Sequence, residues 1–201
     1  MDLEKRIEEL KPWYQQVDFG NGVKSPGHTD CGDLVWPVIR KFMPPSLAGL
    51  RILDMGANTG IHCVRAALEG AEAVGVDNND APMATRQQVF VKKFFEEKYN
   101  TKLKIQYFES EIEDFIFDYS SERFDLILAL SVLHHFRYSR HKEFIEKLGI
   151  MTDNVLVRFR AGNIDKNYAF FDKLFLDCGF MSSGVRENAT SPHLYLIHYT
   201  K

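Results

Sequence analysis

The feature that most constrains the fold is an alternation of short apolar strands with helices that runs from Arg51 to Tyr199. The predicted strands are 51–55, 73–77, 104–108, 124–130, 154–159, 181–186 and 194–199. The predicted helices span 61–69, 82–99, 139–148 and 168–178, with one more short helix before residue 124. This alternation predicts an α/β fold with a Rossmann-like, doubly wound and mostly parallel sheet of seven strands.

Two of these strands carry additional information about the sheet. The strand 124–130 has almost no polar residue, as expected for a parallel strand covered by helices on both faces. The strand 194–199 comes after 181–186 with no helix between them, which predicts an antiparallel hairpin at the C-terminus.

The chain upstream of the alternation has a different character. The sequence predicts a short amphipathic helix at 3–10, a loop or short hairpin at 13–32 and a second helix at 34–42. The second helix is expected to end at Pro44, since proline cannot continue a helix. We therefore divide one compact domain into an N-terminal part, 1–45, and a core, 46–201.

Composition excludes several classes of protein. The chain has 28 acidic and 25 basic residues, so its net charge gives no reason to expect an anionic membrane or nucleic acid as partner. The N-terminus has no apolar signal core, and the longest nearly uncharged run, 126–136, is shorter than the roughly 20 residues that span a bilayer. Three scattered cysteines without metal-ligand spacing indicate reduced thiols and no metal site (Cys31, Cys63, Cys178). These features predict a cytoplasmic protein.

The turn after the first strand of the core is the first candidate binding site. It contains Asp54, Gly56 and Gly60 but lacks the three-glycine fingerprint of dinucleotide-binding folds. Asp54 would repel a pyrophosphate, yet it can accept a hydrogen bond from an ammonium group. S-adenosylmethionine has an amino-acid end and no phosphate, so it suits this turn better than NAD. The simpler alternative is that Asp54 caps the following helix.

Two further positions suit a bound nucleoside. Asp77 ends the second strand, where a carboxylate can accept hydrogen bonds from both ribose hydroxyls. Glu111 and Ile112 follow the third strand and are placed to meet the adenine edge and face. Glu111 also belongs to an acidic run, 109–114, that could simply be solvated.

Several of these segments resemble a known family. Residues 51–60 and 69–77 resemble motif I and the acidic ribose motif of class I S-adenosylmethionine-dependent methyltransferases, and 124–135 looks like their fourth motif. Residues 13–27 are similar to the entrance segment of a subgroup that includes glycan O-methyltransferases and relatives of tRNA wobble-uridine (carboxy)methyltransferases. The resemblance is good over 12–136 and extends to the rest of the chain only as a fold.

The resemblance implies roles for individual residues. It implies that Asp54, Gly56, Asn58, Gly60 and Asp77 hold the cofactor, with Leu130 near its methionine end. Together with Ala57, Asn78, Glu111 and Ile112, these residues form the predicted cofactor-binding set. The segment 13–27 is implied to fold over the pocket as a substrate entrance and lid, so that Trp13, Tyr14 and Lys24 contact the acceptor. The chain departs from its relatives at His134, where tyrosine is common, and at the basic strand end 157–160, where an acidic residue is common.

His134 and His135 are the candidate catalytic residues. They close the fourth strand of the core beside the expected methyl group, and histidine is a suitable general base near neutral pH. Neighbours on an extended segment point to opposite sides, and we favour His135 because it matches the position more often histidine in the subgroup. The alternative is that both side chains only hydrogen-bond the backbone of the loop.

Basic residues suggest how an acceptor is recognised. Arg137, Arg140, His141, Lys142, Arg158 and Arg160 are expected on one rim, where they would favour an anionic acceptor. A solvated, charged start of a helix is the simpler explanation.

Three functions remain open at this point. The leading prediction is an enzyme, an S-adenosylmethionine-dependent methyltransferase that O-methylates a small-molecule or glycan acceptor. The alternatives are a tRNA wobble-uridine modifying enzyme and a non-catalytic S-adenosylmethionine-binding regulatory protein.

Overall fold

The computed structural model describes residues 2–29, 31–78, 80, 83–135, 140–160, 168–182, 187–188 and 194–201. The N-terminal part contains α1 (Leu3–Glu9), β1 (Asp18–Gly20), β2 (Val23–Lys24), η1 (Asp33–Val35), α2 (Trp36–Ile39) and η2 (Arg40–Phe42). The strands of the core are β3 (Arg51–Met55), β4 (Glu72–Asp77), β5 (Ile105–Glu109), β6 (Leu126–Leu130), β7 (Asn154–Arg160), β8 (Met181–Ser182), β9 (Glu187–Asn188) and β10 (Leu194–Thr200). Its helices are α3 (Ile61–Leu68), α4 (Ala84–Tyr99), α5 (Ile112–Asp118), η3 (Leu133–His135), α6 (His141–Met151) and α7 (Ala169–Asp177).

The core strands form one sheet in the order β5-β4-β3-β6-β7-β10-β8, with β9 also paired to β10. The strands β3 to β7 pair in parallel, and β10 runs antiparallel to β7. Because β8 and β9 pair with different parts of β10, they share one edge position, and the described strands fill seven positions. The predicted Rossmann-like sheet and its antiparallel C-terminal hairpin are confirmed.

The strand order reverses between β3 and β6, and this reversal fixes where a ligand can bind. From β3 the chain moves outward to β4 and β5, then returns to the other side of β3 to form β6 and β7. The loops after β3 and β6 therefore diverge and leave a crevice at the carboxyl ends of these strands.

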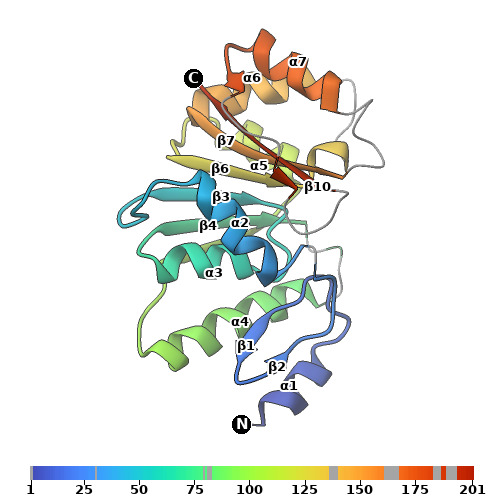
Figure 1. The fold of residues 1–201 in the computed structure, drawn as a ribbon, viewed down its shortest axis with the longest axis vertical. Helices are drawn as coiled ribbons and strands as arrows, with labels where there is room; N and C mark the ends of the chain where they lie inside the picture. Colours follow the sequence, from blue (N-terminus) through green and yellow to red (C-terminus); the bar gives the residue numbers. More distant parts are fainter. Residues whose placement is uncertain are drawn as a thin grey trace.

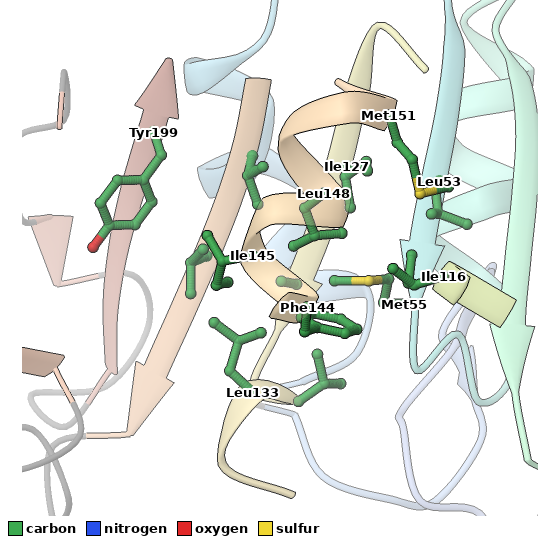
Figure 2. Close-up of a cluster of buried hydrophobic side chains, with 14 of the residues drawn as sticks. Leu53, Met55, Ile116, Ile127, Leu133, Phe144, Ile145, Leu148, Met151 and Tyr199 are labelled. Atoms are coloured by element: carbon green, nitrogen blue, oxygen red, sulfur yellow. The ribbon is translucent and has the colours of Figure 1, made fainter. Parts of the chain in front are cut away.

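One face of the sheet is covered by α5, α6 and α7. Figure 2 shows Phe144, Ile145, Leu148 and Met151 of α6 in one cluster with Ile116 of α5 and with side chains of the strands, and all five side chains are buried. Deleting a large buried side chain of this kind costs about 2–5 kcal/mol, so this face holds the strands in register.

The other face is covered by α2, α3 and α4 and by the N-terminal part. In Figure 1, α1, β1 and β2 lie at the bottom beside α4, far from α6 and α7 at the top. Arg65 of α3 ties this part to the core, because its Nη2 donates to Asp33 Oδ2 at 2.6 Å and the same oxygen accepts from Asp18 N at 2.8 Å.

The predicted helix at 34–42 is present only as three short turns, η1, α2 and η2. Pro37 lies in the first turn of α2 and has no amide hydrogen, so it cannot donate to the carbonyl of Asp33. The predicted hairpin within 13–32 is confirmed by the pairing of β1 with β2. Within the described ranges, no helix is long and apolar enough to cross a bilayer.

Candidate active site

A cavity of about 500 Å³ lies at the carboxyl ends of the central strands. It is lined by Tyr14, Gln15, Cys31, Asp54, Gly56, Asn58, His62, Asp77, Asn78, Asp80, Glu111, Ile112, Glu113, Leu130, Ser131, Val132, His135 and Arg158. The structure therefore brings together most of the predicted cofactor residues, including Asp54, Asp77 and Glu111, although they come from different parts of the chain.

The turn after β3 is held against the end of β4. The amides of Gly56 and Ala57 both donate to Val76 O, at 2.8 and 3.1 Å, and Asn58 N donates to Asp77 Oδ2 at 2.8 Å. Gly56 has a φ of 75°, and a Cβ there would lie 2.5 Å from Val132 Cγ1. Only glycine fits this position, which lets the main chain form part of the cavity wall.

Two predicted cofactor residues, Ala57 and Gly60, do not line the cavity. Ala57 is completely buried, and Gly60 begins α3 with a φ of 74° directly against the ring of Tyr107. Both residues shape the turn, and their predicted contact with the cofactor stays a prediction.

Asp54 is buried at the bottom of the cavity, with 2% of its surface exposed. Burial, together with the nearby Asp77, raises its pKa from 3.8 to about 7, although Cys63 and Arg158 oppose the shift. Near neutral pH the empty site therefore holds an Asp54 carboxyl that is only partly ionised. A ligand ammonium group beside it would stabilise the ionised form.

This pKa predicts that ligand affinity depends on pH. S-adenosylhomocysteine, which carries the same ammonium group as S-adenosylmethionine, should bind about tenfold more weakly per pH unit below pH 7, because Asp54 must first lose its proton. Calorimetric titration between pH 5.5 and 7.5 measures this slope. Methylthioadenosine lacks the ammonium group and should show no such slope; an equal slope for both ligands would contradict this role of Asp54.

The sequence analysis did not predict several residues of the lining, and three of them come from segments with no expected role in the site. His62 lies in the first turn of α3, where its position is typical of a core residue, and only 2% of its surface is exposed. Gln15 is also buried, and its Oε1 accepts from Thr59 Oγ1 at 2.6 Å, which ties the N-terminal part to the turn after β3. Cys31 is the third, and the chain carries no motif around it.

The two adjacent histidines are not on an extended segment. They lie in the 3₁₀ turn η3, and their ring centroids are 4.0 Å apart, so the expectation that they point to opposite sides is wrong. His135 is exposed and lines the cavity, whereas His134 does not line it.

Other predicted acceptor contacts lie away from the cavity. Trp13 is buried in the N-terminal cluster, where its Nε1 donates to Ile7 O at 2.9 Å, and Lys24 forms an ion pair with Asp18 at 3.2 Å. Neither is among the residues that line the cavity, so their predicted contacts with the acceptor stay predictions, whereas Tyr14 does line it.

The expected basic rim is only partly supported. Arg140 and Lys142 are paired with Glu143 and Glu146, and His141 is buried in α6. Arg137 and the side chain of Arg160 lie outside the described residues. Arg158 does line the cavity, but only 4% of its surface is exposed, so it belongs to the interior and not to a rim.

A family model described as a methyltransferase domain matches residues 33–152, which is more than half of the chain. The chain belongs to this family. The predicted class I fold of S-adenosylmethionine-dependent methyltransferases and the predicted transferase class are thereby confirmed.

Two curated relatives match part of this methyltransferase. It is 37% identical over 118 residues to the ubiquinone biosynthesis O-methyltransferase of Nitrobacter winogradskyi, covering 59% of this chain and 38% of the relative. It is 36% identical over 90 residues to the enzyme of the same name from Rhodopseudomonas palustris, covering 45% of this chain and 31% of the relative. The chain thus spans less than two fifths of the length of these relatives.

Solved structures share the fold of this methyltransferase at low identity. The N-terminal domain of EvdMO1, solved with S-adenosylhomocysteine and D-fucose, has a TM-score of 0.68 at 16% identity and matches over 99% of this chain and 96% of its own. The magnesium protoporphyrin IX methyltransferase of Synechocystis, with bound S-adenosylmethionine, has a TM-score of 0.63 at 17% identity, covering 84% and 76%.

S-adenosylmethionine is the cofactor of this enzyme class, and the residues of the cavity fit it. Asp77 suits the ribose hydroxyls, Ile112 offers an apolar wall for adenine, and the buried Asp54 suits the ammonium group. Gly56 lets the main chain approach the ligand closely. The methyltransferase would hold its cofactor across the ends of β4, β3 and β6.

Proposed function

We propose that this methyltransferase transfers a methyl group from S-adenosylmethionine to a hydroxyl oxygen of a small-molecule or glycan acceptor. The observation that carries this proposal is the position of His135, an imidazole on the lining of the cavity close in sequence to Leu130 and Ser131. Other groups of the lining suit the cofactor, and His135 is exposed whereas His62 is buried, so His135 is the histidine placed to meet an acceptor.

The reaction needs few groups from the protein. The sulfonium of the bound cofactor supplies an activated methyl group, so alignment of the acceptor oxygen is the main requirement. His135 takes the hydroxyl proton while the new O–CH₃ bond forms and the S–CH₃ bond breaks. The proton ends on the His135 imidazole, and it then passes to solvent because this side chain is exposed.

The comparisons support a hydroxyl acceptor. The curated relatives are named as O-methyltransferases of ubiquinone biosynthesis, and the EvdMO1 domain was solved with the sugar D-fucose. The lining includes Asp54, Asp77, Asp80, Glu111 and Glu113 against a single arginine. This acidic lining favours an uncharged acceptor over the anionic acceptor or RNA that the basic rim suggested.

The test is methyl transfer from radiolabelled S-adenosylmethionine to a panel of phenols, sugars, carboxylic acids, amines and tRNA. We expect transfer to a phenol or sugar hydroxyl, and a loss of about 10²- to 10⁴-fold in kcat for His135→Gln. Binding of S-adenosylhomocysteine to this variant should be unchanged, which serves as the control for folding.

Other outcomes of this test point elsewhere. Transfer only to tRNA, amines or carboxylic acids would contradict the proposal, and a larger loss in His134→Gln would reassign the base. Cofactor binding without turnover on any acceptor would favour the non-catalytic regulatory protein.

A further inference from the structure

Two buried side chains, Arg158 and His62, line the same cavity as Asp54 and have no role in the reaction described above. Arg158 comes from β7, and its Nε donates to Ser131 Oγ at 3.0 Å in the loop after β6. Its charge lies near enough to lower the pKa of both Asp54 and His62. His62, Asp54 and Arg158 therefore form one cluster on the face of the sheet that α3 covers.

His62 is the member of this cluster whose hydrogen bonding is incomplete. Its ring lies 6.3 Å from that of Trp36, nearly parallel to it, and both residues are buried. Among the described residues neither ring nitrogen has a hydrogen-bond partner, although the main chain of Cys31 lies nearby. A buried imidazole without a partner is costly, so its presence on a cavity wall indicates that a ligand completes its hydrogen bonding.

We propose that Arg158 and His62 bind the α-carboxylate of the methionine end of S-adenosylmethionine. In an amino acid the ammonium and the carboxylate are attached to the same carbon, so a ligand whose ammonium lies on Asp54 places its carboxylate against the neighbours of Asp54. The Arg158 guanidinium lies near Asp54 and the His62 imidazole lies near Arg158, and both groups are donors for a carboxylate. The cluster thus offers one acid and two donors to a zwitterion.

The depth of the cluster separates this assignment from acceptor recognition. Arg158 and His62 are 4% and 2% exposed, and Gln15 and Cys31 of the N-terminal part line the same cavity. His135, which faces the acceptor, is exposed. A group that reaches Arg158 must therefore belong to the ligand bound deepest in the cavity, which is the cofactor.

The test compares three ligands by calorimetry on the intact protein. Decarboxylated S-adenosylmethionine lacks only the carboxylate, and methylthioadenosine lacks the whole amino-acid end. We expect the wild type to bind S-adenosylmethionine about 10- to 100-fold more tightly than its decarboxylated form, because hydrogen bonds to charged groups are strong. This comparison needs no variant, so it does not depend on whether a substitution disturbs folding.

Substitutions then show which residues cause the preference for S-adenosylmethionine over its decarboxylated form. Arg158→Gln should reduce the preference to within about threefold, and His62→Phe, which keeps a ring beside Trp36, should reduce it in part, while methylthioadenosine binds as before. Equal affinity of the wild type for both sulfonium ligands would overturn the proposal. It would also be overturned if Arg158→Gln lost affinity equally for S-adenosylmethionine and its decarboxylated form. The same holds if the only effect of Arg158→Gln were a higher KM for an acceptor. The proposal rests on the cofactor and not on the acceptor, so failure of the acceptor screen leaves it unaffected.

Discussion

Replacing Asp54 with asparagine is expected to stabilise the empty protein and at the same time weaken binding of S-adenosylhomocysteine about 100-fold. Asparagine has nearly the same shape but no charge, so the variant loses the partner of the ligand ammonium. It also loses the cost of ionising a buried carboxyl group. One pKa unit corresponds to about 1.4 kcal/mol, so the rise of the Asp54 pKa from 3.8 to about 7 sets an upper bound of about 4 kcal/mol on this cost.

The effect of Asp54→Asn on stability depends on the pH. A carboxyl whose pKa is raised in the folded state stabilises the fold below pH 3.8, and this contribution is lost as the pH rises to about 7. The melting temperature of Asp54→Asn should therefore exceed that of the wild type by several degrees above pH 7, and the gap should close toward pH 4. Calorimetric scans at these pH values check it, and a variant less stable than the wild type at pH 8 would contradict it.

Replacing Gly60 with alanine is expected to destabilise the fold by about 3 kcal/mol or more. Alanine in the left-handed region costs about 1–2 kcal/mol, and Gly60 has a φ of 74°. The new Cβ would also lie 2.7 Å from Cζ of Tyr107, and the clash should add about 1–3 kcal/mol. The ring cannot move away freely, because it also lies against Gly75.

Gly49 provides the matched control for this substitution. Its φ is 79°, but a Cβ there would meet nothing within 4 Å. Gly49→Ala should therefore cost only the strain of placing alanine in the left-handed region, about 1–2 kcal/mol. The difference between the two variants in urea unfolding measures the contact with Tyr107. Equal losses in the two variants would show that this contact has no effect.

Much of the core could be predicted because its residues act locally. The strand predicted at 51–55 and the turn that follows are present as expected, since apolar runs and glycines specify backbone conformation directly. Asp54 and Asp77 could be placed in one site because parallel strands bring their carboxyl ends to one edge of a sheet.

The missed residues depend on contacts between distant segments. The cavity position of His62 follows from how α3 packs on the sheet beside Trp36, and the pattern of α3 alone is that of a core helix. Trp13 was assigned to the acceptor because of its place in a motif, yet its ring packs edge-on against Phe19 and Phe90. A motif gives the place of a residue along the chain, and packing decides which side of the chain faces the cavity.

The acidic lining of the cavity also bears on what happens after each turnover. The methyl donor carries a positive sulfonium, whereas the spent thioether is neutral at sulfur, so the bound ligand loses one positive charge when the methyl group leaves. A lining with Asp54, Asp77, Asp80, Glu111 and Glu113 attracts the charged donor more strongly than the neutral product. The same side chains that hold the donor thus favour replacement of the spent product by a new donor molecule, which limits inhibition of the enzyme by its own by-product.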